Sequence, residues 1–418
     1  MIEPTAGIWA LSAAATAGII VRPFAWPECI WPLIAAVVLV TGGLLPPHAA
    51  LRGIARGGDV YAFLLGMMLL AELAREEGLF HWLAVHATRL ARGSPTRLFA
   101  LIFAVGTLVT TFLSNDATAV VLTPAVAAVV QVAEVSQPLP YLLICAFIAN
   151  AASFLLPISN PANLVIYGSR LPSLFEWLPR YTLASGLAIA ATYLALRFTQ
   201  RNALRNAVAI DLELPALRPG AVLTAVGITA TAAVLMVASA YGSQLGLPTL
   251  LAGLATSIMV LPRSETNLAT LLKALSWNVL LLVAGLFVIV EALDRTGITG
   301  HLARLLGSLA ARSAAPAAWV SGISLALGSN LVNNLPAGLF AGRVAAAAHA
   351  PEVVRCAILI GVDLGPNLSV TGSLATILWL GALRRDGYCL GAWQFLKLGA
   401  IVMPPALLTA LLAILAIG

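Results

Sequence analysis

The stretch Phe112-Leu-Ser-Asn-Asp-Ala-Thr-Ala-Val-Val-Leu-Thr-Pro124 places a polar triplet inside one of the most apolar parts of the chain. Across residues 98–135 the only formally charged residues are Asp116 and Glu134. The apolar run before the triplet, 98–113, would be about 24 Å long as a helix, which is short of a hydrocarbon core of ~30 Å. We therefore predict that the chain turns back at the Ser-Asn-Asp triplet as a re-entrant hairpin.

The composition is that of a membrane protein. Of the 418 residues, 60% are hydrophobic and 10% are charged, with a mean hydropathy of +0.97. Soluble proteins carry about 25% charged residues, so most side chains here must face lipid or one another. About ten long apolar stretches predict an all-α polytopic protein of the cell (inner) membrane rather than a β-barrel. Segment 1–21 has no basic leader, so we expect a first membrane segment there and not a cleaved signal.

The second half of the chain repeats the plan of the first. Four pairs of residues stand 219 positions apart: Gly66 and Gly285, Glu72 and Glu291, Gly78 and Gly297, and Asn115 and Asn334. Each Glu-containing string is followed by an amphipathic stretch, an apolar segment and an Asn-centred break. Internal repeats in a membrane protein are typical of secondary transporters, so we predict two repeats of inverted topology, each with a re-entrant hairpin and a broken helix.

A second pair of segments follows the hairpins. Residues 148–166 (IANAASFLLPISNPANLVI) align without a gap on residues 360–378 (IGVDLGPNLSVTGSLATIL), at a spacing of 212. Both are apolar and are interrupted by Pro, Gly, Ser, Thr and Asn. Helix breakers at corresponding depths in two halves predict a binding site near the membrane midplane.

These patterns divide the chain. The predicted first repeat is 1–199, with a hairpin at 97–135 and a broken helix at 140–167. The second is 220–418, with a hairpin at 316–348 and a broken helix at 353–383. Residues 200–219 form a predicted cytoplasmic linker. With the N-terminus outside, more than half of the 23 Lys and Arg residues face the cytoplasm, which has the sign that the positive-inside rule requires.

The breaks hold the residues that we expect to carry function. Asp116 and Asp363 are carboxylates within apolar, broken regions, and such residues are functional candidates by default, although a helix-capping role would also explain them. Glu72 and Glu291 lie at helix ends and are weaker candidates. The residues predicted to line a solute site are Ser114, Asn115, Asn160, Asn163, Asn333, Asn334, Thr371 and Ser373. The alternative is that small polar residues only let the helices pack closely.

The motifs resemble those of the arsenite efflux permease family of the ion-transporter superfamily. The resemblance covers nearly the whole chain and is strongest at SNDATAVVLTPAV (114–126), FIANAASFLLPISNPANLV (147–165), NNLPAGL (333–339) and GVDLGPNLSVTGSLATILWL (361–380). It implies export of arsenite, and usually antimonite, driven by the proton gradient or the membrane potential. It also implies a scaffold domain, a transport domain with two hairpins, and in some members a cytosolic ATPase subunit.

The resemblance supports a site lined by Asn115, Asp116, Asn160, Asn333, Asn334, Asp363, Thr371 and Ser373. We predict proton coupling at Asp116 and Asp363 because a carboxylate that gains and loses a proton can carry the coupled charge. Some members of the family carry Asp where this chain has Asn150. If that carboxylate serves proton coupling, coupling in this chain depends on Asp116 or Asp363. Arsenite is thiophilic, and Cys145 and Cys356 begin equivalent helices. A lone buried Cys is more often a small hydrophobe, so we expect no thiolate ligands.

Three other functions stay open. Sodium/proton antiporters and dicarboxylate carriers belong to the same superfamily, but a dianion would meet the like charge of Asp116. An intramembrane aspartyl protease also needs two membrane aspartates, yet Asp363 lies in a GVD string and Asp116 follows Asn rather than Tyr. We therefore expect a transporter and not an enzyme, with no cofactor, no metal site and no nucleic-acid partner.

Overall fold

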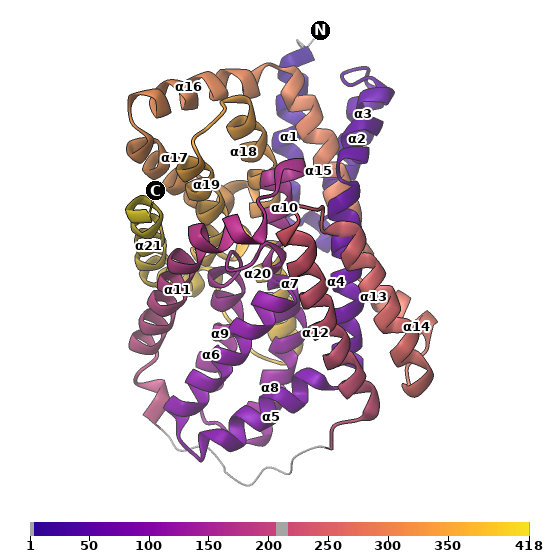
Figure 1. Ribbon diagram of the computed structural model, residues 1–418, viewed down its shortest axis with the longest axis vertical. Coiled ribbons are helices and arrows are strands. Elements are labelled where there is room, and N and C mark those ends of the chain that lie inside the picture. Colours follow the sequence, from indigo (N-terminus) through magenta and orange to yellow (C-terminus); the bar gives the residue numbers. More distant parts are fainter. Residues whose placement is uncertain (1–3, 206–215, 418) are drawn as a thin grey trace.

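The computed structural model describes residues 4–205 and 216–417, and all regular secondary structure in these ranges is helical (Figure 1). Residues 206–215 of the predicted linker lie outside the described residues. The helices of the first half are α1 (Pro4–Val21), α2 (Ile30–Thr41), α3 (Pro47–Arg56), α4 (Gly58–Glu76), α5 (Leu79–Ala91), α6 (Pro95–Phe112), α7 (Asn115–Ala117), α8 (Thr123–Val132), α9 (Leu139–Ala151), α10 (Pro161–Tyr167) and α11 (Leu174–Thr199).

The second half has the same order of elements. Its helices are α12 (Pro219–Ala240), α13 (Gly246–Val260), α14 (Leu268–Ala274), α15 (Trp277–Arg295), α16 (Ile298–Arg312), α17 (Ala314–Val332), α18 (Asn334–Ala347), α19 (Glu352–Leu364), α20 (Leu374–Arg385) and α21 (Ala392–Ile417). The starts of α4, α5 and α6 precede those of α15, α16 and α17 by 219 residues.

The chain is a multi-pass membrane protein. Among the described residues, eight helical segments are long and apolar enough to cross a membrane, and α3 and α4, which meet at an angle of 47°, make up to nine. Helices α1, α2 and α9 are also apolar but shorter, so the described residues hold fewer full-length spans than the ten expected. Helix α6 and the segment Asn115–Val132 are each long enough to span, so their re-entrant course stays a prediction.

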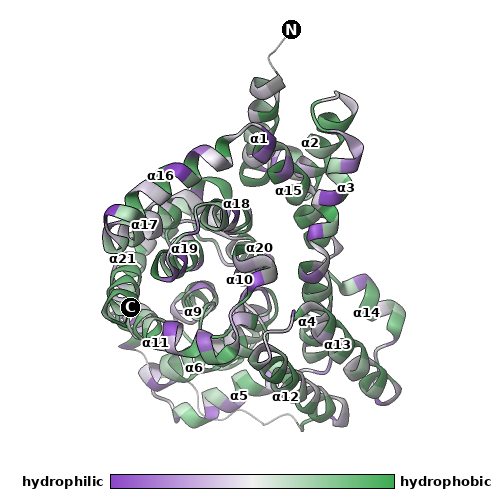
Figure 2. Cartoon of the chain, turned by 45° about the horizontal axis from the view of Figure 1, so that its top comes forward, coloured by the Kyte–Doolittle hydropathy of each residue, from purple (hydrophilic) through white to green (hydrophobic). Residues whose placement is uncertain are grey.

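The helices form two groups, which Figure 2 shows side by side. One group, here called the scaffold group, contains α1–α4 and α12–α15. Within it α4 of the first half packs on α13 of the second, and α15 packs on α2 and α3. A Cβ atom at Gly66 would overlap the Thr249 carbonyl group, and one at Gly285 would lie 2.9 Å from Pro32. Glycine therefore allows the close helix crossing at both equivalent positions.

The other group, the hairpin group, contains α5–α11 and α16–α21. Its hairpins and broken helices are exchanged between the halves: α10 packs on α18, and α20 packs on α8 and the π-helical turn Thr118–Leu122. The amphipathic helices α5 and α16 lie at opposite ends of the molecule (Figure 1). An inverted repeat requires this placement, which supports the inverted relation of the halves, still a prediction.

The structure corrects the register of the broken helices. Helices α9 and α19 begin 213 residues apart and end 213 residues apart, as do the starts of α10 and α20. The gapless sequence alignment at 212 is therefore wrong by one residue. Apolar letters align nearly as well one position away, whereas the N-cap residues, Asn160 and Ser373, fix the register.

Candidate functional site

The first break separates α9 from α10. After α9 ends at Ala151 the chain leaves the helix and makes a 3-10 turn at Pro157–Ser159. Asn160 is extended, with φ −150° and ψ 131°, and its Oδ1 accepts a hydrogen bond from the Ala162 amide at 3.0 Å. Pro161 then occupies the first helical position, where its missing N–H costs nothing. The sequence Ser159-Asn160-Pro161 therefore ends one helical segment and begins the next.

The second break is built differently from the same pattern. Two short turns, Gly365–Asn367 and Val370–Gly372, connect α19 to α20. Ser373 caps α20, and its Oγ accepts a hydrogen bond from the Thr376 amide at 3.1 Å. The N-termini of both restarted helices consequently lie in the interior of the hairpin group, where their N–H groups favour oxygen-bearing partners.

Asp363 joins the two breaks. It lies in the last turn of α19 and its side chain is fully buried. Ser153 Oγ lies 2.7 Å from Asp363 Oδ2, and Asn160 Nδ2 donates to Asp363 Oδ1 at 2.9 Å. Both partners belong to the other half of the chain. Asp363 and Asn160, which the sequence predicted separately, are therefore in direct contact.

Asn150 makes the equivalent connection in the opposite direction. It stands 213 positions before Asp363, near the end of α9, and its Nδ2 donates to Asn367 Oδ1 at 3.0 Å and to Thr376 Oγ1 at 3.4 Å. Asn367 Nδ2 in turn donates to the Phe147 carbonyl at 3.0 Å. Ser373 is linked to this group through Thr376, whose Oγ1 is 2.9 Å from Ser373 Oγ.

Asn163 stabilises the backbone between α9 and α10. Its Nδ2 donates to the Ser153 carbonyl at 2.9 Å and also contacts the carbonyls of Leu156 and Pro157. These three carbonyls belong to the segment that connects α9 to α10. Asn163, which we expected to line a solute site, holds the backbone of the break in this structure.

The tip of the first hairpin faces a small cavity. Ser114 Oγ accepts from the Ala117 amide at 3.3 Å, and Asn115 Oδ1 accepts from the Asp116 amide at 2.9 Å. Asp116 is half-buried and, with Ser114, lines a cavity of about 60 Å³. The other described residues that line it are Phe63, Leu64, Met67, Met68, Ala71, Glu72, Ala117, Val120, Val121, Pro161, Ala274, Leu275, Ser276, Val279 and Leu378. None of them is Lys, Arg or His.

The tip of the second hairpin is linked to the second break. Asn333 has φ +71° and its Oδ1 accepts from the Leu335 amide at 3.4 Å, while Asn334 is buried. Thr371 Oγ1 donates to the Asn330 carbonyl at 2.9 Å, and Ser369 Oγ donates to Asn330 Oδ1 at 2.7 Å. Thr371 is thus placed against hairpin α17–α18.

The expected residues therefore belong to separate clusters. Asp363, Asn160 and, through Asn150, Ser373 form a buried centre; Ser114, Asn115 and Asp116 form the cavity tip. The two aspartates share no hydrogen-bonded partner among the described residues. Sequence reasoning missed Ser153, Asn367, Thr376 and Asn330, although all are small polar residues inside or beside the predicted breaks.

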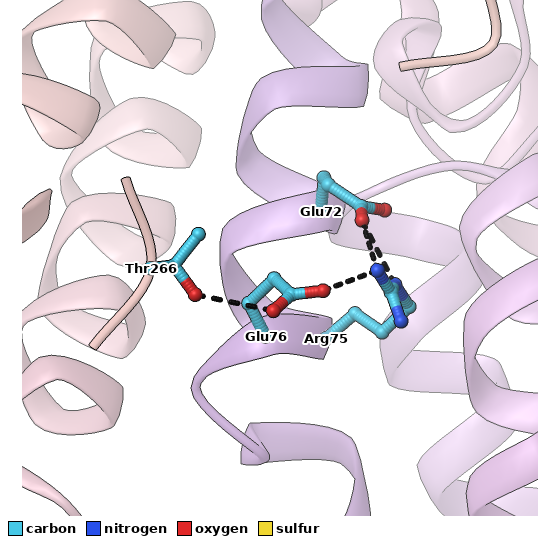
Figure 3. A network of polar contacts seen from close by, with 4 residues as sticks. All are labelled: Glu72, Arg75, Glu76 and Thr266. Carbon is cyan, nitrogen blue, oxygen red and sulfur yellow. Dashed lines mark hydrogen bonds and ion pairs between the residues drawn. The ribbon is translucent and has the colours of Figure 1, made fainter. Parts of the chain in front are cut away.

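The two equivalent glutamates have different partners. Glu72, which lines the cavity, pairs with Arg75 on its own helix; Arg75 also pairs with Glu76, which accepts from Thr266 Oγ1 at 3.1 Å (Figure 3). Glu291 instead pairs with arginines of two other helices, Arg56 of α3 at 2.6 Å and Arg343 of α18 at 3.3 Å. Only the second network connects the scaffold group to a hairpin.

The thiols do not form a common site. Cys29, Cys145 and Cys356 are buried and Cys389 is exposed. Cys145 and Cys356 lie on the equivalent helices α9 and α19, but in the register of 213 Cys145 corresponds to Ile358 and not to Cys356. Within ranges 4–205 and 216–417, no group of three or more His, Cys, Asp and Glu side chains is arranged to hold a metal ion.

Comparison with known proteins identifies the family. The profile of the citrate transporter family matches residues 20–362. The chain belongs to this family. Its members are membrane transporters, and the expected resemblance to arsenite permeases is confirmed by the relatives. An arsenical pump membrane protein of Yersinia enterocolitica is 27% identical over 366 residues, which is 84% of this chain and 85% of the relative. The protein of that name from Escherichia coli K12 is 27% identical, covering 88% and 90% of the two chains.

Solved structures support the fold. The YdaH transporter of Alcanivorax borkumensis superposes with a TM-score of 0.57 at 18% identity, covering 90% of this chain and 88% of its own. MtrF of Neisseria gonorrhoeae gives a TM-score of 0.51 at 14% identity, covering 100% and 94%. At these identities the likeness concerns the fold alone. The family match, the relatives and the apolar helices together make the chain a multi-pass transporter of the cell membrane.

Proposed function

We propose that this chain is a secondary active transporter that exports arsenite, and with it antimonite, in exchange for protons. The observation that carries the proposal is the cavity at the tip of the first hairpin. Its volume of about 60 Å³ suits a small hydroxylated solute, and its polar lining is supplied by Ser114, Asp116, Glu72 and Ser276. The hydroxyl groups of neutral arsenous acid can donate hydrogen bonds to such carboxylates, and a neutral solute brings no charge that would repel them.

Proton coupling follows from the charge of the solute. A neutral solute gains nothing from the membrane potential, so uphill export needs a coupled charge. A carboxylic acid that gains and loses a proton supplies one. Asp116, at the cavity, and Asp363, in the buried centre, are the two candidates, and the 27% identity to arsenical pump membrane proteins is consistent with this function.

Citrate transport is the second candidate because the family profile carries that description. A tricarboxylate is much larger than arsenous acid and would meet two carboxylates in a cavity with no basic side chain among its described lining residues. Like charges at short range are strongly unfavourable, so we place citrate behind arsenite. A sodium/proton antiporter is compatible with the two carboxylates and is the third outcome to be tested.

Uptake into everted vesicles distinguishes these functions. Arsenite, citrate, succinate and sodium are offered separately, with and without an uncoupler and with no added ATPase subunit. We expect uptake of arsenite alone, abolished by the uncoupler. Expression in an arsenic-sensitive host should also lower cellular arsenic and raise tolerance. Unchanged cellular arsenic, with the protein present in the membrane, would contradict the proposal.

A further inference from the structure

Ser153 contacts two acceptors at once. Its Oγ lies 2.7 Å from Asp363 Oδ2 and 2.7 Å from the Asn150 carbonyl oxygen. A serine hydroxyl carries one hydrogen, and a backbone carbonyl carries none. Two short O···O contacts therefore need a second hydrogen, and Asp363 is the only one of the three groups that can provide it.

Asp363 Oδ1 is a hydrogen-bond acceptor, which is consistent with a proton on Oδ2. Asn160 Oδ1 accepts from the Ala162 amide at 3.0 Å, so the orientation of the Asn160 side-chain amide is fixed by the helix cap. Its Nδ2 then faces Asp363 Oδ1 as a donor at 2.9 Å. Oδ1 therefore acts as an acceptor, so the second hydrogen that the Ser153 contacts require belongs on Oδ2.

Among the described residues no ion pair joins Asp363 to a cation. The charged side chains of its own helix, Glu352 and Arg355, lie in the first turns of α19, at the opposite end from Asp363. The charged or titratable side chains of the helices packed against α19 are Arg343 of α18, Lys397 of α21, Tyr167 of α10, and Tyr141 and Cys145 of α9. Arg343 is paired with Glu291 and Asp294, and Lys397 lies 5.5 Å from the centre of the Trp393 ring. The hydroxyl of Tyr167 faces Tyr181 and Glu352, and that of Tyr141 donates to the Pro95 carbonyl. A fully buried carboxylate without a cation is costly, which again favours the neutral acid.

We propose that Ser153 is the positioning residue for the Asp363 proton. In this structure protonated Asp363 donates a hydrogen bond to Ser153 Oγ, and the Ser153 hydroxyl donates a hydrogen bond to the Asn150 carbonyl. When the O–H bond of Asp363 breaks and its proton leaves, the Ser153 hydroxyl rotates about its Cβ–Oγ bond and donates to Asp363 Oδ2 instead, while the O–H bond of Ser153 itself stays intact. The protonation state of a residue in the second half is thereby communicated to the end of α9 in the first half.

This role in coupling rests on the proposed function, but the hydrogen-bond assignment does not. The residue equivalent to Ser153 in the second half is Pro366, which has no hydroxyl. The chain therefore has one such hydroxyl rather than a symmetric pair. A measurement of the Asp363 carboxyl group without any solute separates a failure of this proposal from a failure of arsenite transport.

Infrared difference spectroscopy of the protein in nanodiscs provides the test. At neutral pH we expect a carboxylic-acid C=O band that shifts in D₂O and is absent in Asp363→Asn. Ser153→Ala should move that band because the acid loses its acceptor, and Ser153→Thr should restore its position. Ser159→Ala is the matched control, since Ser159 is a buried hydroxyl of the same break that donates to the Thr111 carbonyl.

Three results would overturn the proposal. In the first, Asp363→Asn removes no carboxylic-acid band from the wild-type spectrum, which would mean that Asp363 is ionised. Another is a band that Ser153→Ala leaves in place. The third is an equal shift in Ser159→Ala, which would show that loss of any hydroxyl in the break disturbs the acid. Size-exclusion chromatography of each variant confirms that the protein compared is folded.

Discussion

The broken helices α9–α10 and α19–α20 have matching boundaries but different chemistry. At equivalent positions near the ends of α9 and α19, one carries Asn150 and the other Asp363. Both side chains are fully buried and both reach into the break of the other half. Asn150 donates to acceptors, whereas Asp363 meets the donor of Asn160 and the hydroxyl of Ser153. The same backbone therefore provides one fixed polar contact and one that can respond to a proton.

The largest expected effect is that of Asp363→Asn. An Asn side chain reproduces the neutral acid, because its oxygen accepts from Asn160 and its amide donates to Ser153. The variant should fold but lose concentrative export, while downhill exchange of arsenite persists. A pH dye in everted vesicles measures the proton flux when arsenite is added.

The same substitution at the cavity residue Asp116 completes this test. Asp116→Asn should also abolish concentrative export, and at least one of the two variants should retain arsenite binding. Glu72→Gln and Glu291→Gln should be milder. Uphill export with unchanged proton movement in both Asn variants would show that neither aspartate is the coupling residue, and would turn attention to the two glutamates.

Exchanging the two residues asks whether the halves are interchangeable. In Asn150→Asp the new carboxyl group faces Asn367 Oδ1, an acceptor whose amide is held by the Phe147 carbonyl. We expect a stability loss of about 1–3 kcal/mol from the lost donor, read from thermal unfolding in detergent. The double variant Asn150→Asp, Asp363→Asn should not pump. Restored export in it would contradict the asymmetry described above.

A smaller effect is expected at Glu291. Arg343→Gln removes the partner that links the scaffold group to α18, and Arg56→Gln removes a partner within the scaffold group. The Arg343 side chain is 17% exposed and that of Arg56 is 55% exposed. Removing Arg343 should cost about 1–3 kcal/mol, because Glu291 keeps one partner, and removing Arg56 about 1 kcal/mol or less. Equal losses of stability in the two variants, measured by thermal unfolding, would show that the ion pair between the scaffold group and α18 contributes no more than the one within the scaffold group.

The smallest effect should come from the thiols. Replacing Cys29, Cys145, Cys356 and Cys389 together by Ala or Ser should leave arsenite export largely intact, because the carboxylates and hydroxyls of the cavity supply the polar contacts. Vesicle uptake checks this, with the amount of protein in the membrane as the control. Loss of uptake traced to Cys145 or Cys356 would assign a thiol to the solute site.

Part of the site was predictable because helix breakers have local causes. Asn160 with Pro161, and Ser373 with the preceding Gly, stop and cap helices whatever surrounds them, and a buried Asp in such a break is a strong signal. Ser153, Asn367 and Thr376 were missed because a small polar residue in a membrane helix usually bonds to its own backbone. Only the contact across the two halves distinguishes them.

The sequence by itself determined the membrane class, the order of elements in the two halves and the places where the helices break. Hydropathy, Pro and N-cap residues act over a few neighbouring residues, so they can be recognised in one dimension. Only the tertiary structure decided the register of 213, the exchange of hairpins between the halves and the three-group contact of Asp363, Ser153 and Asn150. These depend on which surfaces meet when segments about 210 residues apart pack together, and no local pattern records that.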